Sequence, residues 1–283
     1  MQQRKRDVSK YIKNGHTKSW TFAEALEKPV ENGLNSIIVK KRWLDFRYED
    51  RGSKVTLVTF SAALSPNFKT YPVFSAAPTA ERLGVNYLGF ADPAYGGEES
   101  LPTFWHLGTK RVDSQSLIPQ IIRKVLTEGS GSDLLFFGSS AGGFAALNYS
   151  SKFPGSAVVA VNPRINLLND PKRMPEYTSV AFPGEDRSAV ARSLPYNLAK
   201  VYEKPHENHV VYVQNLQDDL YVSNHYSHFE KATRGRTDVT FVTGDWGVGH
   251  VVPPRHVYED PLQRLVDAAP AWGSAVFSGS DFT

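Results

Sequence analysis

The stretch that decides the fold runs from residue 134 to residue 147 and reads Leu-Leu-Phe-Phe-Gly-Ser-Ser-Ala-Gly-Gly-Phe-Ala-Ala-Leu. It begins as an apolar strand, turns through Gly-x-Ser-x-Gly around Ser140, and continues as a helix of small residues. In such a turn the serine is strained, so the residues two before and two after it must lack side chains. Gly138 and Gly142 meet this need. The pattern predicts that Ser140 is a nucleophile held between a strand and a helix.

The start of the helix also predicts how negative charge is stabilised beside Ser140. The first N–H groups of a helix have no partner within it, and the helix dipole favours negative charge there. We therefore expect the Ala141 N–H to be one donor to an oxyanion. A glycine-rich phosphate loop is the alternative structure, but the Gly-Lys-Ser/Thr residues of such loops are missing.

Length and composition limit the classes of protein to consider. A chain of 283 residues, 41% of them hydrophobic, can form one substantial core. The 32 basic and 29 acidic residues leave a net charge of +3, and neither sign is gathered into a long block, since the N-terminal run Arg4-Lys5-Arg6 is short, so we expect no nucleic-acid partner. With no cysteine, the chain has no thiolate nucleophile, disulfide or cysteine zinc site.

The N-terminus has no apolar stretch after its basic residues, and no segment approaches the length of a membrane span. We expect a cytoplasmic protein with no membrane partner, no metal and no cofactor. The sequence leaves the oligomeric state open.

Short apolar runs separated by helix-length segments indicate an α/β fold with a mostly parallel central sheet and helices on both faces. The predicted parallel strands are Val55–Phe60, Val85–Phe90, Leu134–Phe137, Ala157–Val161, Val210–Val213 and Val239–Val242. The predicted helices are Leu117–Leu126, Gly142–Ser151, Ser223–Ala232 and Pro261–Ala269.

Two regions depart from this alternation. Residues 1–50 predict an N-terminal arm and an edge hairpin, in which Ser36–Lys40 pairs with Trp43–Tyr48. Residues 51–283 form the main domain. Within it, residues 162–202 are rich in proline and charge, and we expect a short cap-like insertion over the carboxyl edge of the sheet, where ligands bind in such folds.

From about Val55 to the C-terminus, the strand order and the turn at Ser140 resemble the α/β-hydrolase superfamily. Three segments are also similar to bacterial hydrolase-like proteins linked with surface-polysaccharide and accessory-secretion acyl modification. They are Phe90-Ala91-Asp92-Pro93, the glycine-rich turn at 138–144, and Gln214-Asn215-Leu216-Gln217-Asp218. The superfamily resemblance implies a serine hydrolase with the order nucleophile, acid, histidine.

The resemblance places the acid after the strand Val210–Val213, where Asp218 and Asp219 compete for the role. We favour Asp218, since in the resembling sequences one Asp follows Gln and precedes, four residues on, a valine like Val222. Asp219 would then be an acidic residue at the N-terminus of the next helix.

His250 lies in the glycine-rich loop after the last strand, which is where the superfamily presents its base. His256 is the reserve candidate. His225 and His228 are three residues apart on a predicted helix, but they lack an acidic partner at the spacing of a zinc motif. We expect these two histidines to lie on a solvated face or a pocket wall.

A second oxyanion donor is expected after the strand Val55–Phe60, and Ala62 is our choice, although the HGGG type of motif is absent. This departure argues against the lipase and carboxylesterase subfamilies. Tyr95, Trp105, His106 and Trp246 are candidate substrate contacts, since aromatic faces suit sugar rings and other moderately apolar esters. Core packing is the alternative role of these aromatic residues.

The sequence thus predicts a serine esterase that acts on a small-molecule or glycan ester through an acyl-enzyme on Ser140. One alternative is an acyltransferase that uses the same residues and passes the acyl group to a glycan or another alcohol. The other is a non-catalytic binding protein on the same fold.

Overall fold

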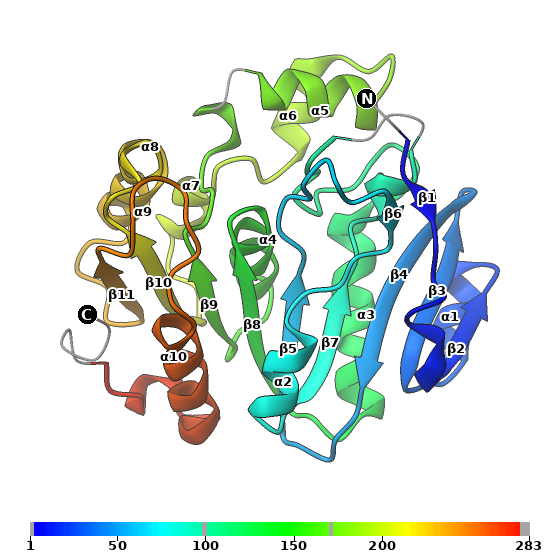
Figure 1. The fold of residues 1–283 in the computed structure, drawn as a ribbon, viewed down its shortest axis with the longest axis horizontal. Helices are drawn as coiled ribbons and strands as arrows, with labels where there is room; N and C mark the ends of the chain where they lie inside the picture. The colour runs from blue at the N-terminus through cyan, green and yellow to red at the C-terminus, as the bar shows by residue number, and fades with distance from the viewer. Residues whose placement is uncertain (1–2, 98–100, 170–171, 278–283) are drawn as a thin grey trace.

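The computed structural model describes residues 3–97, 101–169 and 172–277, and within them one large sheet has nine strands. Their spatial order is β11-β10-β9-β8-β5-β7-β4-β3-β2 (Figure 1). The bounds are β2 His16–Ser19, β3 Gly33–Val39, β4 Arg42–Glu49, β5 Val55–Phe60, β7 Asn86–Phe90, β8 Asp133–Ser139, β9 Ala157–Val161, β10 His209–Asn215 and β11 Val239–Gly244. β1 (Lys5–Arg6) and β6 (Thr70–Tyr71) form a separate parallel pair.

The strands from β11 to β7 run parallel to one another, and they include all six predicted parallel strands. The central residues of β10, β9, β8, β5 and β7 are buried because helices cover both faces, which explains why these strands are mainly apolar instead of alternating. The prediction of a mostly parallel α/β sheet is confirmed.

The predicted hairpin is present as β3 and β4, which are antiparallel. Gly33 pairs with Tyr48 at one end, and Val39 pairs with Arg42 at the turn. Its turn consists of Lys40 and Lys41, whose φ angles of 46° and 66° are those of a tight two-residue hairpin turn. The hairpin does not form the edge of the sheet. β4 pairs with β7 on one side, and β2 adds a parallel strand outside β3. The sheet therefore extends into the first fifty residues.

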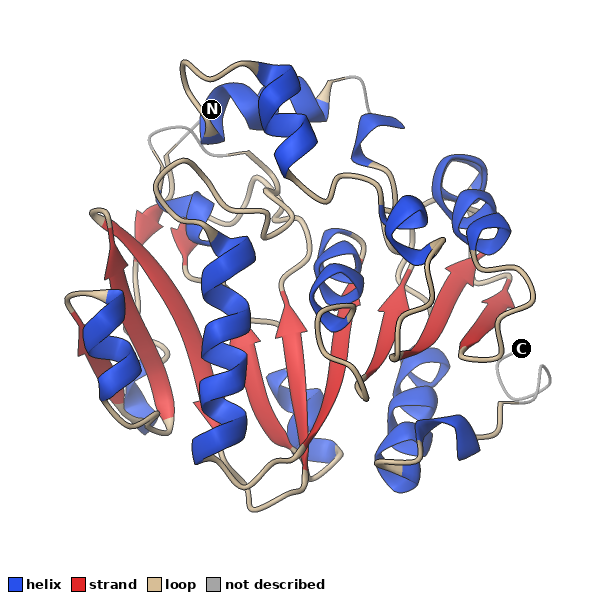
Figure 2. Ribbon diagram, turned by 180° about the vertical axis from the view of Figure 1, so that it is seen from behind, coloured by secondary structure: helices blue, strands red, loops and turns tan. Residues whose placement is uncertain are grey.

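Two apolar clusters lie on opposite faces of the sheet because alternate side chains of each strand point in opposite directions. On β8, Phe136 belongs to one cluster, whereas Leu135 and Phe137 belong to the other. Helices α3 (Ser114–Glu128) and α4 (Ala141–Ser150) cover the first face, and α2 (Ala77–Arg82) and α10 (Arg255–Ala268) cover the second. In Figure 2, which views the molecule from the side opposite to Figure 1, α3 lies in front of the sheet.

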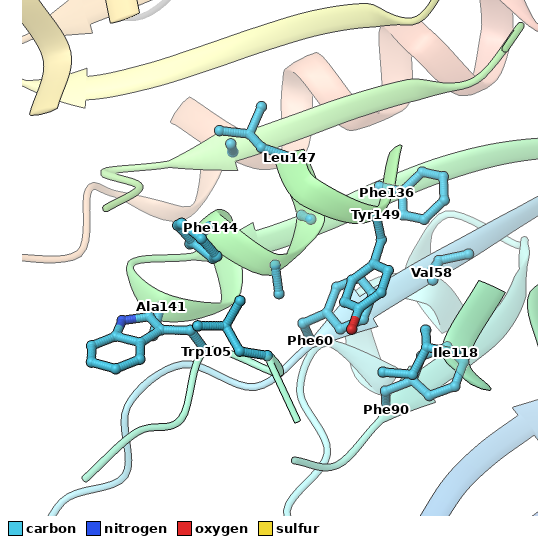
Figure 3. Close-up of a cluster of buried hydrophobic side chains, with 14 of the residues drawn as sticks. Val58, Phe60, Phe90, Trp105, Ile118, Phe136, Ala141, Phe144, Leu147 and Tyr149 are labelled. Atoms are coloured by element: carbon cyan, nitrogen blue, oxygen red, sulfur yellow. The ribbon is translucent and has the colours of Figure 1, made fainter. Parts of the chain in front are cut away.

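The first face also holds an aromatic stack that fixes α4 against the sheet. The ring of Phe60 on β5 stacks between Phe90 on β7 and Tyr149 on α4, with ring centroids 5.6 and 5.0 Å apart (Figure 3). The stack thus links α4, the helix that starts directly after Ser140, to β5 and β7.

The segment between β9 and β10 contains α5 (Arg173–Ala181), α6 (Arg187–Ser193) and α7 (Leu198–Tyr202). An isolated antiparallel bridge between Asn166 and Asn197 brings its two ends together. Figure 1 shows α5 and α6 beyond the carboxyl ends of the central strands. Residues 170–171 of the predicted insertion lie outside the described residues.

The chain from β10 to β11 contains α8 (Asp219–Tyr221), one π-helical turn (Val222–Tyr226) and α9 (Ser227–Ala232). α1 (Phe22–Glu27) follows β2. In the described residues, no helix combines the length and apolarity that crossing a membrane requires.

Candidate active site

Ser140 lies in a sharp turn between β8 and α4, with φ 53° and ψ −112°. The flanking glycines make this turn possible. A Cβ on Gly138 would lie 2.2 Å from the carbonyl oxygen of Gly142, and one on Gly142 would lie 2.4 Å from the carbonyl oxygen of Phe60. Side chains at either position would force apart strand, helix and the end of β5. The glycines therefore determine where the Ser140 hydroxyl lies.

Ser140, His250 and Asp218 are brought together from three separate loops. The Oγ of Ser140 lies 2.9 Å from Nε2 of His250, and Nδ1 of His250 lies 2.6 Å from Oδ2 of Asp218. Asp218 is buried, whereas about a third of the His250 side chain is exposed, with relative exposures of 4% and 37%. A buried carboxylate that accepts the Nδ1 proton leaves Nε2 free to accept the serine proton.

The competing candidates lie elsewhere. Asp219 is exposed in the first turn of α8, as expected for an acidic residue at a helix N-terminus. His256 is exposed in the first turn of α10. The geometry joins Asp218, and neither Asp219 nor His256, to the Ser140–His250 pair.

The two histidines predicted on one helix, His225 and His228, differ in exposure to solvent. His228 is exposed, whereas His225 is buried and its Nδ1 accepts a hydrogen bond from the Asn166 N–H. Burial, followed by the positive charge of Arg164, lowers the pKa of His225 to about 3. His225 is thus neutral at ordinary pH. Among the described residues, no group of three or more His, Cys, Asp or Glu is arranged to hold a metal ion.

Two buried asparagines hold the loop that carries His250. Asn162 follows β9, accepts the Asn215 N–H at 2.7 Å and donates to the Val251 carbonyl at 2.9 Å. The side chain of Asn215, at the end of β10, donates to the Gly249 carbonyl at 3.0 Å. The loop on both sides of His250 is therefore tied to the ends of two strands. The sequence signal for both residues is an amide side chain within two residues of the end of an apolar run, Ala157–Val161 for Asn162 and Val210–Val213 for Asn215.

The two predicted oxyanion donors come from the start of α4 and from the loop after β5. Ala141 is the first residue of α4, so its N–H has no acceptor within the helix. Ala62 is half-buried in the loop after β5, the strand next to β8. The same loop is held by His106, whose Nε2 lies 3.3 Å from both Oγ and O of Ser61.

The predicted substrate contacts are mostly core residues in this structure. Tyr95 is 1% exposed and its hydroxyl donates to the Pro102 carbonyl. His106 is 1% exposed, and burial lowers its pKa. Trp105 is also buried and belongs to the same apolar cluster as Ala141 (Figure 3). Substrate could contact these three side chains only if the surrounding loop moved, whereas Trp246 is half-buried beside the His250 loop.

Tyr221 is a site residue that the sequence analysis did not identify. Its ring stacks on that of His250, with centroids 3.8 Å apart and an interplanar angle of 23°. Its hydroxyl lies 3.4 Å from Oγ of Ser140 and accepts a hydrogen bond from Nη2 of Arg164 at 3.2 Å. The available signal is its spacing of three residues from Asp218, which places it one helical turn later.

A search against protein families finds no match, and a search of curated proteins finds none either. Solved structures are similar in fold. The capsule O-acetyltransferase of Neisseria meningitidis serogroup A, as its H228A mutant with CoA, aligns with a TM-score of 0.61 at 16% identity, over 80% of this chain and 95% of that one.

Two hydrolases are similar to a comparable degree. The S-formylglutathione hydrolase of Agrobacterium tumefaciens has a TM-score of 0.57 at 14% identity, over 89% of this chain and 95% of that one. An esterase of Pyrococcus furiosus has a TM-score of 0.57 at 17% identity, over 96% and 97% of the two chains. At such low identities the likeness concerns the fold. The predicted resemblance is confirmed at that level: this chain has an α/β-hydrolase-like fold.

Proposed function

We propose that this protein is a serine hydrolase that cleaves an ester or a related acyl bond through an acyl-enzyme on Ser140. The observation that carries the proposal is the hydrogen-bond series from Ser140 through His250 to the buried Asp218. The strained backbone of Ser140 supports it, because such strain persists where it holds a functional group in place. Neighbours in fold that are named as a hydrolase and as an esterase agree with this chemistry.

In the proposed reaction, Oγ of Ser140 attacks the carbonyl carbon while Nε2 of His250 takes its proton. Asp218 holds the imidazole in the required tautomer and stabilises the imidazolium. The N–H groups of Ala141 and Ala62 would donate to the oxyanion. His250 then protonates the leaving group. In the second half, water gives a proton to His250 and attacks the acyl carbon. The bond from this carbon to Oγ breaks, His250 returns the proton to Oγ, and the carboxylic acid leaves.

Acyl transfer is the second candidate function, and the fold of the capsule O-acetyltransferase favours it. The segment 162–202, which we propose forms a cap over the carboxyl edge, also supports it, because its basic side chains would suit an anionic acceptor or substrate. These residues are Arg164, Lys172, Arg173, Arg187 and Arg192. Intact-protein mass spectrometry separates the two functions. A hydrolase loses its acyl group in plain buffer, and a transferase retains it until an acceptor alcohol is added.

Labelling with a fluorophosphonate tests the proposed nucleophile, because this reagent traps activated serines. We expect the label on Ser140 in the wild type and no label in Ser140→Ala. The rate of p-nitrophenyl acetate hydrolysis should fall by about a thousandfold or more in this variant. Ser139→Ala is the matched control and should retain both. Wild-type turnover in Ser140→Ala would overturn the proposal, and a folded wild type that neither labels nor turns over esters would favour the non-catalytic alternative.

A further inference from the structure

Tyr221 contacts all three residues of the proposed triad. Its backbone N–H donates to Oδ1 of Asp218 at 3.2 Å, its ring stacks on the imidazole of His250, and its hydroxyl lies 3.4 Å from Oγ of Ser140. The side chain is buried, with a relative exposure of 5%. A buried hydroxyl beside the proposed nucleophile requires a role or a structural explanation.

Hydrogen bonds link Arg164, Tyr221, Ser140, His250 and Asp218 in that order, and the residues at the two ends fix the direction of each bond. Arg164 can only donate, so the phenol oxygen of Tyr221 accepts its proton. At the other end, ionised Asp218 can only accept, so His250 donates from Nδ1 and accepts from the Ser140 hydroxyl at Nε2. The hydroxyl proton of Tyr221 is thus directed toward Oγ of Ser140.

We propose that Tyr221 is a further catalytic residue, which donates a hydrogen bond to Oγ of Ser140 and speeds the step in which this oxygen leaves the acyl group. The inference rests on the proposed function. In that step water adds to the acyl carbon and gives one proton to His250. The bond from carbon to Oγ then breaks, and the proton of His250 passes to Oγ. Tyr221 keeps its own proton throughout.

The effect is expected mainly in deacylation. In acylation Oγ is the attacking atom, and a hydrogen bond donated to it lowers its electron density as it attacks. In deacylation Oγ gains negative charge as it leaves, and the same hydrogen bond stabilises that charge. Hydrogen bonds to charged groups are stronger than neutral ones, so we expect Tyr221 to speed deacylation about 10- to 100-fold.

The effect of the Tyr221 hydroxyl on the reaction can be measured separately from the effect of its ring. Stacking on the imidazole stabilises the positive charge that His250 gains in both halves of the reaction. Tyr221→Phe retains the ring, and it also retains the hydrogen bond from the backbone to Asp218. The substitution removes the hydroxyl, and with it the contacts to Ser140 and to Arg164.

The experiment uses p-nitrophenyl dimethylcarbamate, which transfers a slowly hydrolysed carbamoyl group to activated serines. Release of p-nitrophenol gives the rate of carbamoylation. After excess reagent is removed, intact-protein mass spectrometry and recovered esterase activity give the rate of decarbamoylation. The proteins compared are wild type, Tyr221→Phe and the matched control Tyr226→Phe, whose hydroxyl bonds to Glu230 outside the site.

We expect Tyr221→Phe to carbamoylate within about threefold of wild type and to decarbamoylate about 10- to 100-fold more slowly. Tyr226→Phe should match wild type in both steps. Decarbamoylation of Tyr221→Phe at the wild-type rate, or equal slowing of both steps, would overturn the role of Tyr221 and leave the proposed function standing. A wild type that is not carbamoylated on Ser140 would overturn the proposed function itself.

Discussion

Replacement of His225 by asparagine should make the stability of the protein less sensitive to acid. His225 is buried against Tyr221, with ring centroids 4.8 Å apart, and accepts a hydrogen bond from the Asn166 N–H. Burial lowers its pKa to about 3. An unfolded histidine has a pKa of about 6.5, so between these values the unfolded chain binds more protons than the folded one. The free energy of unfolding therefore falls as the pH drops through this window.

The magnitude follows from the two pKa values. Each pH unit below about 6.5 lowers the free energy of unfolding by about 1.4 kcal/mol, as long as the folded histidine stays neutral. From about pH 7.5 to about pH 5.0, His225 alone should cost about 2 kcal/mol. Burial also lowers the pKa values of His106 and His209, but their effects are common to wild type and variant.

The assay is urea unfolding followed by tryptophan fluorescence at both pH values. His225→Asn leaves space in the core and should be less stable at each pH, so the informative quantity is the change between them. We expect this change to be about 2 kcal/mol smaller in His225→Asn than in wild type. His228→Asn, which alters an exposed residue of the same helical region, should behave as wild type. An equal loss of stability in wild type and His225→Asn would refute the reasoning.

The remaining predictions concern the acid and the base. Asp218→Asn should lower kcat for p-nitrophenyl acetate by about 10³- to 10⁴-fold, because the amide cannot hold the imidazole in the required tautomer, and Asp219→Asn should lie within about twofold of wild type. The reverse order would assign the role to Asp219. His250→Ala should remove most turnover of the same ester, whereas His256→Ala should preserve it in a steady-state assay. Wild-type turnover in His250→Ala would exclude it as the base.

The parallel strands and the turn at Ser140 could be predicted because their signals are local. A buried strand needs a short apolar run, and the turn needs two glycines at fixed spacing, so neighbouring residues contain the information. The choice of Asp218 over Asp219 as the acid depended on a resemblance and stays a prediction. In the structure, Asp218 is buried against His250, while Asp219 is exposed.

Features that depend on distant pairing were missed. Tyr221 meets Ser140 across 81 residues, and Asn162 meets Val251 across 89. No local pattern shows such contacts. The edge position of the hairpin was wrong because β2, a short polar strand from His16 to Ser19, lacks an apolar run that would reveal it. Aromatic composition could not show whether Tyr95 lines a pocket or fills the core.

The hydrogen bonds from Asn162 and Asn215 to the His250 loop affect which residues of this loop can vary. Asn162 and Asn215 grip the loop through main-chain carbonyls, which every residue type provides. Val248 and Val252, two positions to either side of His250, are 84% and 69% exposed. These two side chains can therefore change without loss of the hydrogen bonds that hold the loop. Selection, or a library made in the laboratory, could vary the rim of the site while the imidazole stays in place.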